Sequence, residues 1–250
     1  MSDEGTFDNF FRPRSVAVVG ASPQRGSARN TIVRVLLKHG FGGRVYPVSP
    51  SHAEIEGLKA YASIGVLPEA PELALVITPA HTVPGIIAEC GAMGIRNAIV
   101  YSSGFEEVES GKALARKLAE AAAQHNVAVL GPNCQGIWSI QQRSMLTFSS
   151  GPLNLEKLQQ APIAVISQSG ALAGAIGAYL QASGIGCSYI VSVGNETCLD
   201  ALDFLGWVIE QDDVRVVALY IEGLDDASRI LRIAERARER SVQILSLIHI

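Results

Sequence analysis

Ser167-Gln168-Ser169-Gly170 is the stretch of this sequence whose residue types are best suited to chemistry. It follows an apolar run, 164–166, and leads into small and apolar residues that predict a helix. A tight turn from a strand into a helix leaves backbone N–H groups unpaired at one point, where the helix dipole also attracts negative charge. The turn therefore suits either a serine nucleophile or a cradle for a phosphate group.

The nucleophile is the weaker of these two interpretations. The hydrolase elbow G-x-S-x-G centred on Ser169 requires glycine where Ser167 and Ala171 stand. No sequence feature places any of four histidines as a general base: His39, His52, His81 and His125. A cradle of backbone amides fits the turn better, and the scattered histidines predict no metal site.

Glu222 is a second residue that could do chemistry, because it ends a strongly apolar run at 216–221. Ligands of open α/β sheets bind at the carboxyl ends of the strands. A carboxylate at such an end either begins a turn or orients a catalytic group. The residues alone leave both interpretations open.

Short apolar runs alternate with helix-like segments along the chain, which predicts parallel sheets covered by helices. In the first half, strands are expected at 15–19, 44–48, 73–78, 97–101 and 127–130, and helices at 27–39, around 86–90 and at 106–124. In the second half, strands are expected at 162–166, 188–193, 214–221 and 241–250, and helices at 170–183, 199–210 and 225–240. Since no helix follows the last strand, we expect a truncated domain, and the native origin of residues 246–250 is left open.

The strands of the first half end in small or turn-forming residues, at 20–26, 47–50, 78–80, 102–104 and 131–133. Such residues can simply terminate strands, but five of these ends along one edge favour a nucleotide-type site. NAD is disfavoured, because the first loop lacks G-x-G-x-x-G and Val48-Ser49-Pro50 offers no acid for a ribose hydroxyl. Arg25 and Arg29 suit either a phosphate-rich ligand or a solvated helix end.

Composition narrows the class of protein. The chain has 250 residues, of which 48% are hydrophobic and 18% charged, and a formal charge of −4 that argues against nucleic acid as a partner. No apolar run reaches the roughly 18 residues of a membrane span. Four widely spaced cysteines without Cys-x-x-Cys indicate reduced thiols. We expect a cytoplasmic protein that binds neither nucleic acid nor membrane.

Taken together, these motifs resemble a known family. The strings SVAVVGAS, RVYPVSP, LALVITPA, AIVYSSGF and LGPNCQG are similar to the CoA-binding domain of the succinyl-CoA synthetase α subunit and, more closely, of the ADP-forming acetate–CoA (acyl-CoA) ligases. The strings PIAVISQSGALAGA, SVGNETCLDALDFL and LYIEGLDDASRI resemble the ligase domain that follows it. The resemblance implies a Rossmann-like CoA-binding domain at 1–135, a linker at 136–160 and a flavodoxin-like parallel α/β domain at 161–250, incomplete at its C-terminus.

The resemblance also implies a reaction. In the family, acyl-CoA and phosphate give an acyl phosphate and free CoA, and a histidine passes the phosphoryl group to ADP in an ATP-grasp domain. Ser169 and Gly170 would bind phosphate, and Glu222 would orient the phosphohistidine. The residues that would hold CoA are Gly20, Ala21, Ser22, Arg25, Val48, Ser49, Pro50, Thr78, Pro79, Ala80, Ser102, Ser103, Gly104, Asn133 and Cys134.

Several parts of the family pattern are missing from this sequence. The phosphorylated histidine lies beyond the last strand, and His249 sits in a tail that does not match the pattern. No ATP-grasp domain is present, so ADP, ATP and Mg²⁺ would bind only through a further domain or subunit, and oligomerisation is expected. The chain should therefore bind CoA without turnover. An alternative is a CoA-binding regulatory module of a protein acetyltransferase, and a more remote one is an NAD(P)-binding oxidoreductase module.

Overall fold

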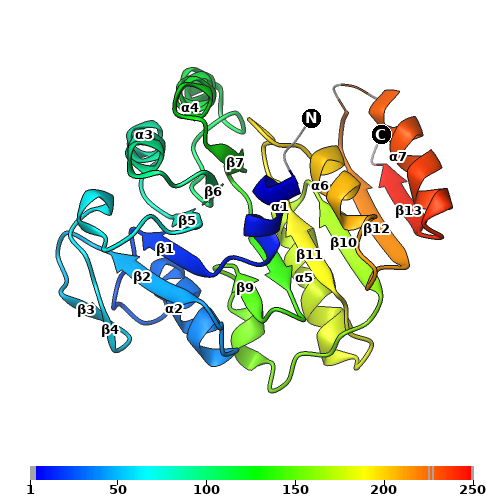
Figure 1. Cartoon of the computed structure of the whole chain (residues 1–250), viewed down its shortest axis with the longest axis horizontal. Coiled ribbons are helices and arrows are strands. Elements are labelled where there is room, and N and C mark those ends of the chain that lie inside the picture. The colour runs from blue at the N-terminus through cyan, green and yellow to red at the C-terminus, as the bar shows by residue number, and fades with distance from the viewer. Residues whose placement is uncertain (1–3, 225, 227, 249–250) are drawn as a thin grey trace.

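The computed structural model describes residues 4–224, 226 and 228–248. It contains two α/β units side by side, each built on its own large sheet (Figure 1). No helix in the described part of the chain is long and apolar enough to cross a membrane.

A five-stranded sheet of order β2-β1-β5-β6-β7 forms the first unit, and its neighbouring strands all run parallel. The strands are β1 (Ser15–Val19), β2 (Arg44–Val48), β5 (Leu73–Val76), β6 (Asn97–Val100) and β7 (Ala128–Leu130). Between them lie α2 (Ala28–Lys38), a hairpin of β3 (Glu54–Ile55) and β4 (Leu58–Lys59), α3 (Val83–Met93) and α4 (Lys112–His125). Short 3₁₀ turns occur at η1 (Ile64–Val66), η2 (Ala80–Thr82) and η3 (Glu109–Gly111).

The side chains of β1 alternate between two separate cores. Val16 and Val18 pack in one core with Ile32 of α2. Ala17 packs in the other with Ile87 of α3. Helices therefore cover both faces of the sheet, with α3 and α4 on the side opposite α2 (Figure 1), which is why its strands are apolar on both faces.

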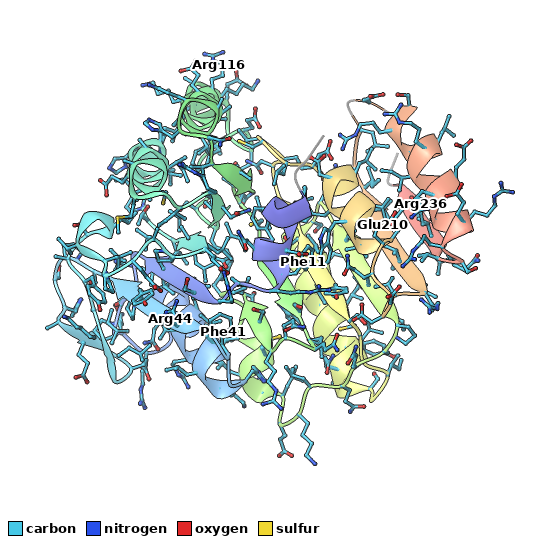
Figure 2. The ribbon with its side chains drawn as sticks, viewed as in Figure 1. Phe11, Phe41, Arg44, Arg116, Glu210 and Arg236 are labelled. Atoms are coloured by element: carbon cyan, nitrogen blue, oxygen red, sulfur yellow. The ribbon has the colours of Figure 1, made fainter. Side chains whose placement is uncertain are left out.

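A six-stranded sheet of order β13-β12-β10-β11-β8-β9 forms the second unit. The strands are β8 (Gly136–Ser139), β9 (Ser144–Leu146), β10 (Ile163–Ser167), β11 (Tyr189–Ser192), β12 (Val216–Ile221) and β13 (Gln243–Ile248). The helices are α5 (Gly170–Ala182), α6 (Ala201–Val208) and α7 (Ser228–Glu239), with a 3₁₀ turn at η4 (Gly151–Asn154). An ion pair of 2.6 Å joins Arg236 of α7 to Glu210 just beyond α6, both labelled in Figure 2.

The second sheet differs from the expected all-parallel arrangement. β8 pairs antiparallel with β11, and β9 antiparallel with β8. Residues 136–146, expected in an irregular linker, therefore extend this sheet. All four residues of β8 are buried, and Trp138 is 1% exposed, so the strand lacks the polar and apolar alternation that would mark it in the sequence.

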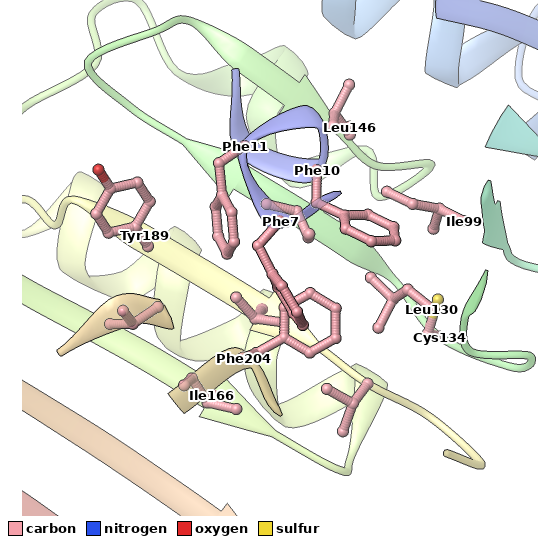
Figure 3. Close-up of a cluster of buried hydrophobic side chains, with 14 of the residues drawn as sticks. Phe7, Phe10, Phe11, Ile99, Leu130, Cys134, Leu146, Ile166, Tyr189 and Phe204 are labelled. Carbon is pink, nitrogen blue, oxygen red and sulfur yellow. The ribbon is translucent and has the colours of Figure 1, made fainter. Parts of the chain in front are cut away.

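α1 (Glu4–Phe11), a helix that lies ahead of the first element expected from the sequence, joins the two units. Its phenylalanines enter a buried aromatic cluster shown in Figure 3. Phe11 stacks on Trp207 of α6 at a centroid distance of 3.9 Å, and Phe10 meets Phe204 edge-on at 5.5 Å. The same core contains Ile99 of β6. This shared core packs the N-terminal helix against both sheets.

Candidate functional site

The carboxyl ends of β1, β2 and β5 meet at one point of the first sheet. The N–H of Gly20 donates to the carbonyl of Val48 at 3.0 Å. Gly20 has φ +92°, and a Cβ at this position would lie 2.6 Å from the carbonyl oxygen of Ile77. Only glycine fits this approach without strain. The chain runs from β1 to β2 on one side and returns to β5 on the other, so this point is the topological switch at which such sheets bind ligands.

The loops after β5, β6 and β7 continue this edge. The Ser102 hydroxyl donates to the carbonyl of Thr78 at 2.6 Å, and the N–H of Asn133 donates to the carbonyl of Ser102 at 3.0 Å. Ser103 is exposed and Gly104 is half-buried with φ +104°. The structure thus brings together the strand-end residues that the sequence singled out.

The remaining predicted residues follow the same edge. Ala21 is buried, Ser49 contacts His52 through a 3.0 Å hydrogen bond, and Pro50, Pro79 and Arg25 are exposed.

Asn30 supports the first loop from beneath and was missed from the sequence. Its side chain is fully buried, and its amide donates to the carbonyl of Ser22 at 3.0 Å and to Glu56 at 2.9 Å. Arg29 donates to the carbonyl of Gly20, so its guanidinium lies against the loop. Asn30 stands between Arg29 and Thr31 in the sequence, so no pattern distinguishes it from a solvated helix position.

Cys134 lies beneath the edge rather than on it. It is 2% exposed, and its thiol contacts the carbonyl of Val100 at 3.4 Å. Burial raises the pKa of this thiol to about 12, so it stays protonated. Asn133 beside it is exposed and has φ +57°, which leaves its side chain as the one that can reach a ligand.

The turn after β10 has the form that the sequence predicted. Ser169 is the N-cap of α5, with extended backbone, and its side chain makes no capping hydrogen bond. The neighbouring Ser167 hydroxyl donates to the carbonyl of Ser169 at 2.8 Å. Gly170 begins the helix, whose first N–H groups lack partners within it.

The two edges touch where the loop after β7 meets the loop after β11. A Cβ on Gly194 would lie 2.3 Å from the carbonyl oxygen of Pro132. The N–H of Asn195 donates to the same carbonyl at 2.9 Å, and its side chain accepts from the Asn133 amide at 3.1 Å. Two residues after Asn133, Gln135 donates its N–H to the Ser192 hydroxyl at 2.9 Å. The loop at Asn133 therefore lies beside the second unit's ligand-binding edge.

Glu107 links the two edges and was missed, because its charge resembles that of a solvated helix face. Its carboxylate accepts from the N–H groups of Gly104 and Phe105 and, at 2.5 Å, from the side chain of Asn195. Burial opposes its charge, but the hydrogen bonds dominate and lower the pKa of Glu107. The helix expected at 106–124 begins only after this segment, at Lys112.

Glu222 follows β12, the direct neighbour of β10. Ser167 pairs with Tyr220, so Glu222 stands two residues beyond the end of this pairing, and its side chain is exposed. Glu222 and the Ser169 turn thus lie at the same edge of the second sheet. His249 lies outside the described residues.

Two pockets of roughly 600 Å³ lie away from the two ligand-binding edges. One is lined by Arg96, Asn126 and Cys198, and the other by Asp8, Trp207 and Arg232, among others. Neither contains a residue of the predicted site.

Comparison with known families assigns both units. Residues 14–139 match the model of the CoA binding domain. The chain belongs to this CoA-binding family. Residues 160–248 match the succinyl-CoA ligase like flavodoxin domain, so the resemblance seen in the sequence is confirmed.

Curated relatives and solved structures agree with this assignment. The chain is 37% identical to the ADP-forming acetate–CoA ligase I of Archaeoglobus fulgidus, over 95% of the chain and 34% of that protein. It is 34% identical to the ADP-forming acetate–CoA ligase I subunit alpha of Pyrococcus furiosus, over 94% of the chain and 51% of the subunit. An acetyl-coenzyme A synthetase of Ca. Korarchaeum cryptofilum, solved with phosphate and ADP, superposes with a TM-score of 0.90 at 34% identity, covering 99% of this chain and 52% of that one. The chain thus spans between a third and a half of these relatives.

Proposed function

We propose that this chain is the CoA-binding part of an NDP-forming acyl-CoA ligase. The proposal rests above all on one observation: five strand-end loops of a CoA-binding domain meet along one edge, and this edge touches the loop after β11 through Asn133 and Asn195. Gln135, on the same side, lies against Gly170 of the Ser169 turn. A thioester held by the first edge would thus have its acyl end near a phosphate held by the second. Relatives that match nearly the whole length of this chain are named as ADP-forming acetate–CoA ligases.

The proposed reaction interconverts acyl-CoA, ADP and phosphate with a carboxylic acid, CoA and ATP. A phosphate oxygen attacks the thioester carbonyl, the C–S bond breaks, and acyl phosphate and free CoA form. The phosphoryl group then moves to a histidine, which releases the carboxylate, and passes from the histidine to ADP to give ATP. In this chain, the loops from Gly20 to Asn133 hold CoA, and Ser169 and Gly170 hold the phosphoryl oxygens on a hydroxyl and helix amides. Glu222 orients the imidazole and its tautomer.

The other parts of the proposal concern what surrounds this chain. The histidine and the ATP-grasp domain that binds ADP and Mg²⁺ would come from a further domain or subunit, and the chain alone would bind CoA without turnover. We also propose a boundary between CoA-binding and ligase domains near residue 135, and a cytoplasmic location, consistent with its four free cysteines.

Calorimetric titration tests the CoA-binding part. We expect the purified chain to bind CoA with a stoichiometry of one and to show no heat with NADH. Ser102→Ala removes the hydroxyl that joins the loops after β5 and β6 and should weaken CoA binding about fivefold. Ser150→Ala, on an exposed loop away from the edge, is the matched control. NADH binding without CoA binding would instead support a dehydrogenase-like module.

A further inference from the structure

Gln168 makes an unusual set of contacts for a residue in a turn. Its side-chain oxygen accepts from the N–H of Glu222 and, at 3.1 Å, from the N–H of Gly223. Its side-chain nitrogen donates to the carbonyl of Gly223 at 2.8 Å. Its own N–H donates to the carbonyl of Tyr220 at 3.2 Å. Gln168 therefore holds the backbone on both sides of the Glu222–Gly223 peptide.

Glu196 anchors the same carboxamide from the third strand end of this edge. One carboxylate oxygen accepts from the Gln168 side chain at 2.5 Å, and the other accepts from the N–H of Ala201 at the start of α6, at 2.6 Å. A carboxylate at a helix N-terminus is held by both the amide and the dipole. Glu196 thus ties the orientation of the Gln168 side chain to the first residue of α6.

The contacts of Gln168 connect the Ser169–Gly170 turn with Glu222. Gln168 is the residue between Ser167 and Ser169, so its backbone belongs to the turn that begins α5. The Glu222 side chain itself is exposed, and the position of its backbone is what fixes where its carboxylate can reach. We propose that Gln168 is a positioning residue, which sets the carboxylate of Glu222 at a fixed place relative to a phosphoryl group on the Ser169–Gly170 amides. This inference rests on the proposed function of that turn.

A purely structural role is the competing explanation. If Gln168 only closed the end of β12, its loss would lower the folding stability of the chain and would weaken the binding of every anion by the same factor. A positioning residue affects mainly ligands that touch the cradle and Glu222 at once. Two probes separate these cases: inorganic phosphate, which needs only the cradle, and N-phosphoimidazole, which adds an imidazole for Glu222 to contact.

The test measures both dissociation constants from the amide shift of Gly170 in NMR titrations at neutral pH. For the unaltered chain we expect N-phosphoimidazole to bind about tenfold more tightly than phosphate, the value of one charged hydrogen bond. Gln168→Met should reduce this ratio to near one and leave phosphate binding within about twofold. Glu222→Gln should have the same effect, because it removes the charge that contacts the imidazole.

Two further variants keep the test decisive. Gln168→Asn keeps a carboxamide beside Glu196 but is one methylene shorter, so it should fold if Gln168→Met does not, and should lower the ratio because it cannot make all the contacts to Glu222, Gly223 and Glu196 at once. Gln160→Met makes the same substitution at an exposed glutamine whose side chain donates to Asp213 at 3.3 Å, and should keep the ratio.

The outcomes distinguish this inference from the proposed function. If the unaltered chain prefers N-phosphoimidazole and the folded Gln168 variants keep that preference, the positioning role is overturned while the cradle stands. If the unaltered chain binds neither probe, the cradle itself is absent, and the proposed function fails together with this inference.

Discussion

The two ligand-binding edges of this molecule are built by different means. At the first sheet, the closest contacts between strand ends are made by backbone groups and glycines, as in the close approach of Gly20 to Ile77 and the bond from Gly20 to Val48, and side chains such as Ser102 add to them. At the second sheet, side chains make them, with Gln168 and Glu196 holding three strand ends together. The first edge is therefore sensitive to added volume, and the second to the loss of a hydrogen-bonding group.

The largest expected effect is a steric one at the first edge. Gly20→Ala places a methyl group 2.6 Å from the carbonyl oxygen of Ile77 at φ +92°, so it combines backbone strain with a clash and should cost about 3 kcal/mol of unfolding free energy or more. Gly26→Ala is the matched control, because Gly26 has φ +84° but open space around it. That variant should lose only about 1 kcal/mol.

Urea unfolding of both variants measures the difference. Equal losses would mean that the conformation alone matters at Gly20 and that the close packing of the loops contributes nothing. CoA titration of the same proteins should show weaker binding for Gly20→Ala than for Gly26→Ala.

The contrast between the edges also explains what the sequence could predict. The strands of the first sheet were predicted because each is a short apolar run ended by residues such as Gly20-Ala21-Ser22 or Ser102-Ser103-Gly104, and parallel pairing brings those ends together. The turn at Ser169 was predicted for the same reason. These features are local in the sequence.

Contacts between distant parts of the chain could not be predicted in this way. Phe11 meets Trp207 across nearly 200 positions, and nothing near Phe11 indicates its partner. β8 was missed because Ile137 and Trp138 are its only large apolar residues, between Gly136 and Ser139, so it neither forms an apolar run like those of the first sheet nor alternates. Glu107 and Glu196 have no distinguishing neighbours in the sequence, since a carboxylate that accepts backbone amides is identified only by the fold around it.

A smaller effect is expected where the two edges are joined by a side chain. Glu107→Gln replaces an acceptor that receives the amides of Gly104 and Phe105 and the side chain of Asn195. Because the residue is exposed, the loss should be about 1 kcal/mol in urea unfolding. Glu109→Gln is the control, since Glu109 pairs with Lys112 only at the surface. If both variants lose the same unfolding free energy, the hydrogen bonds of Glu107 stabilise the fold no more than a surface ion pair does.

The smallest effect is the pH dependence of that link. Hydrogen bonds lower the pKa of folded Glu107 below its ordinary value of 4.5, so its carboxylate stabilises the fold above that pH, and this contribution declines as the pH falls through the folded pKa. The hydrogen bond from Arg236 lowers the pKa of Glu210, so Glu210 adds a contribution of the same sign. The unfolding free energy of Glu107→Gln should therefore approach that of the unaltered chain as the pH is lowered below 4.5. A difference between the two proteins that stays constant from pH 7 to below this value would show that the charge of the Glu107 carboxylate contributes nothing to the link between the two edges.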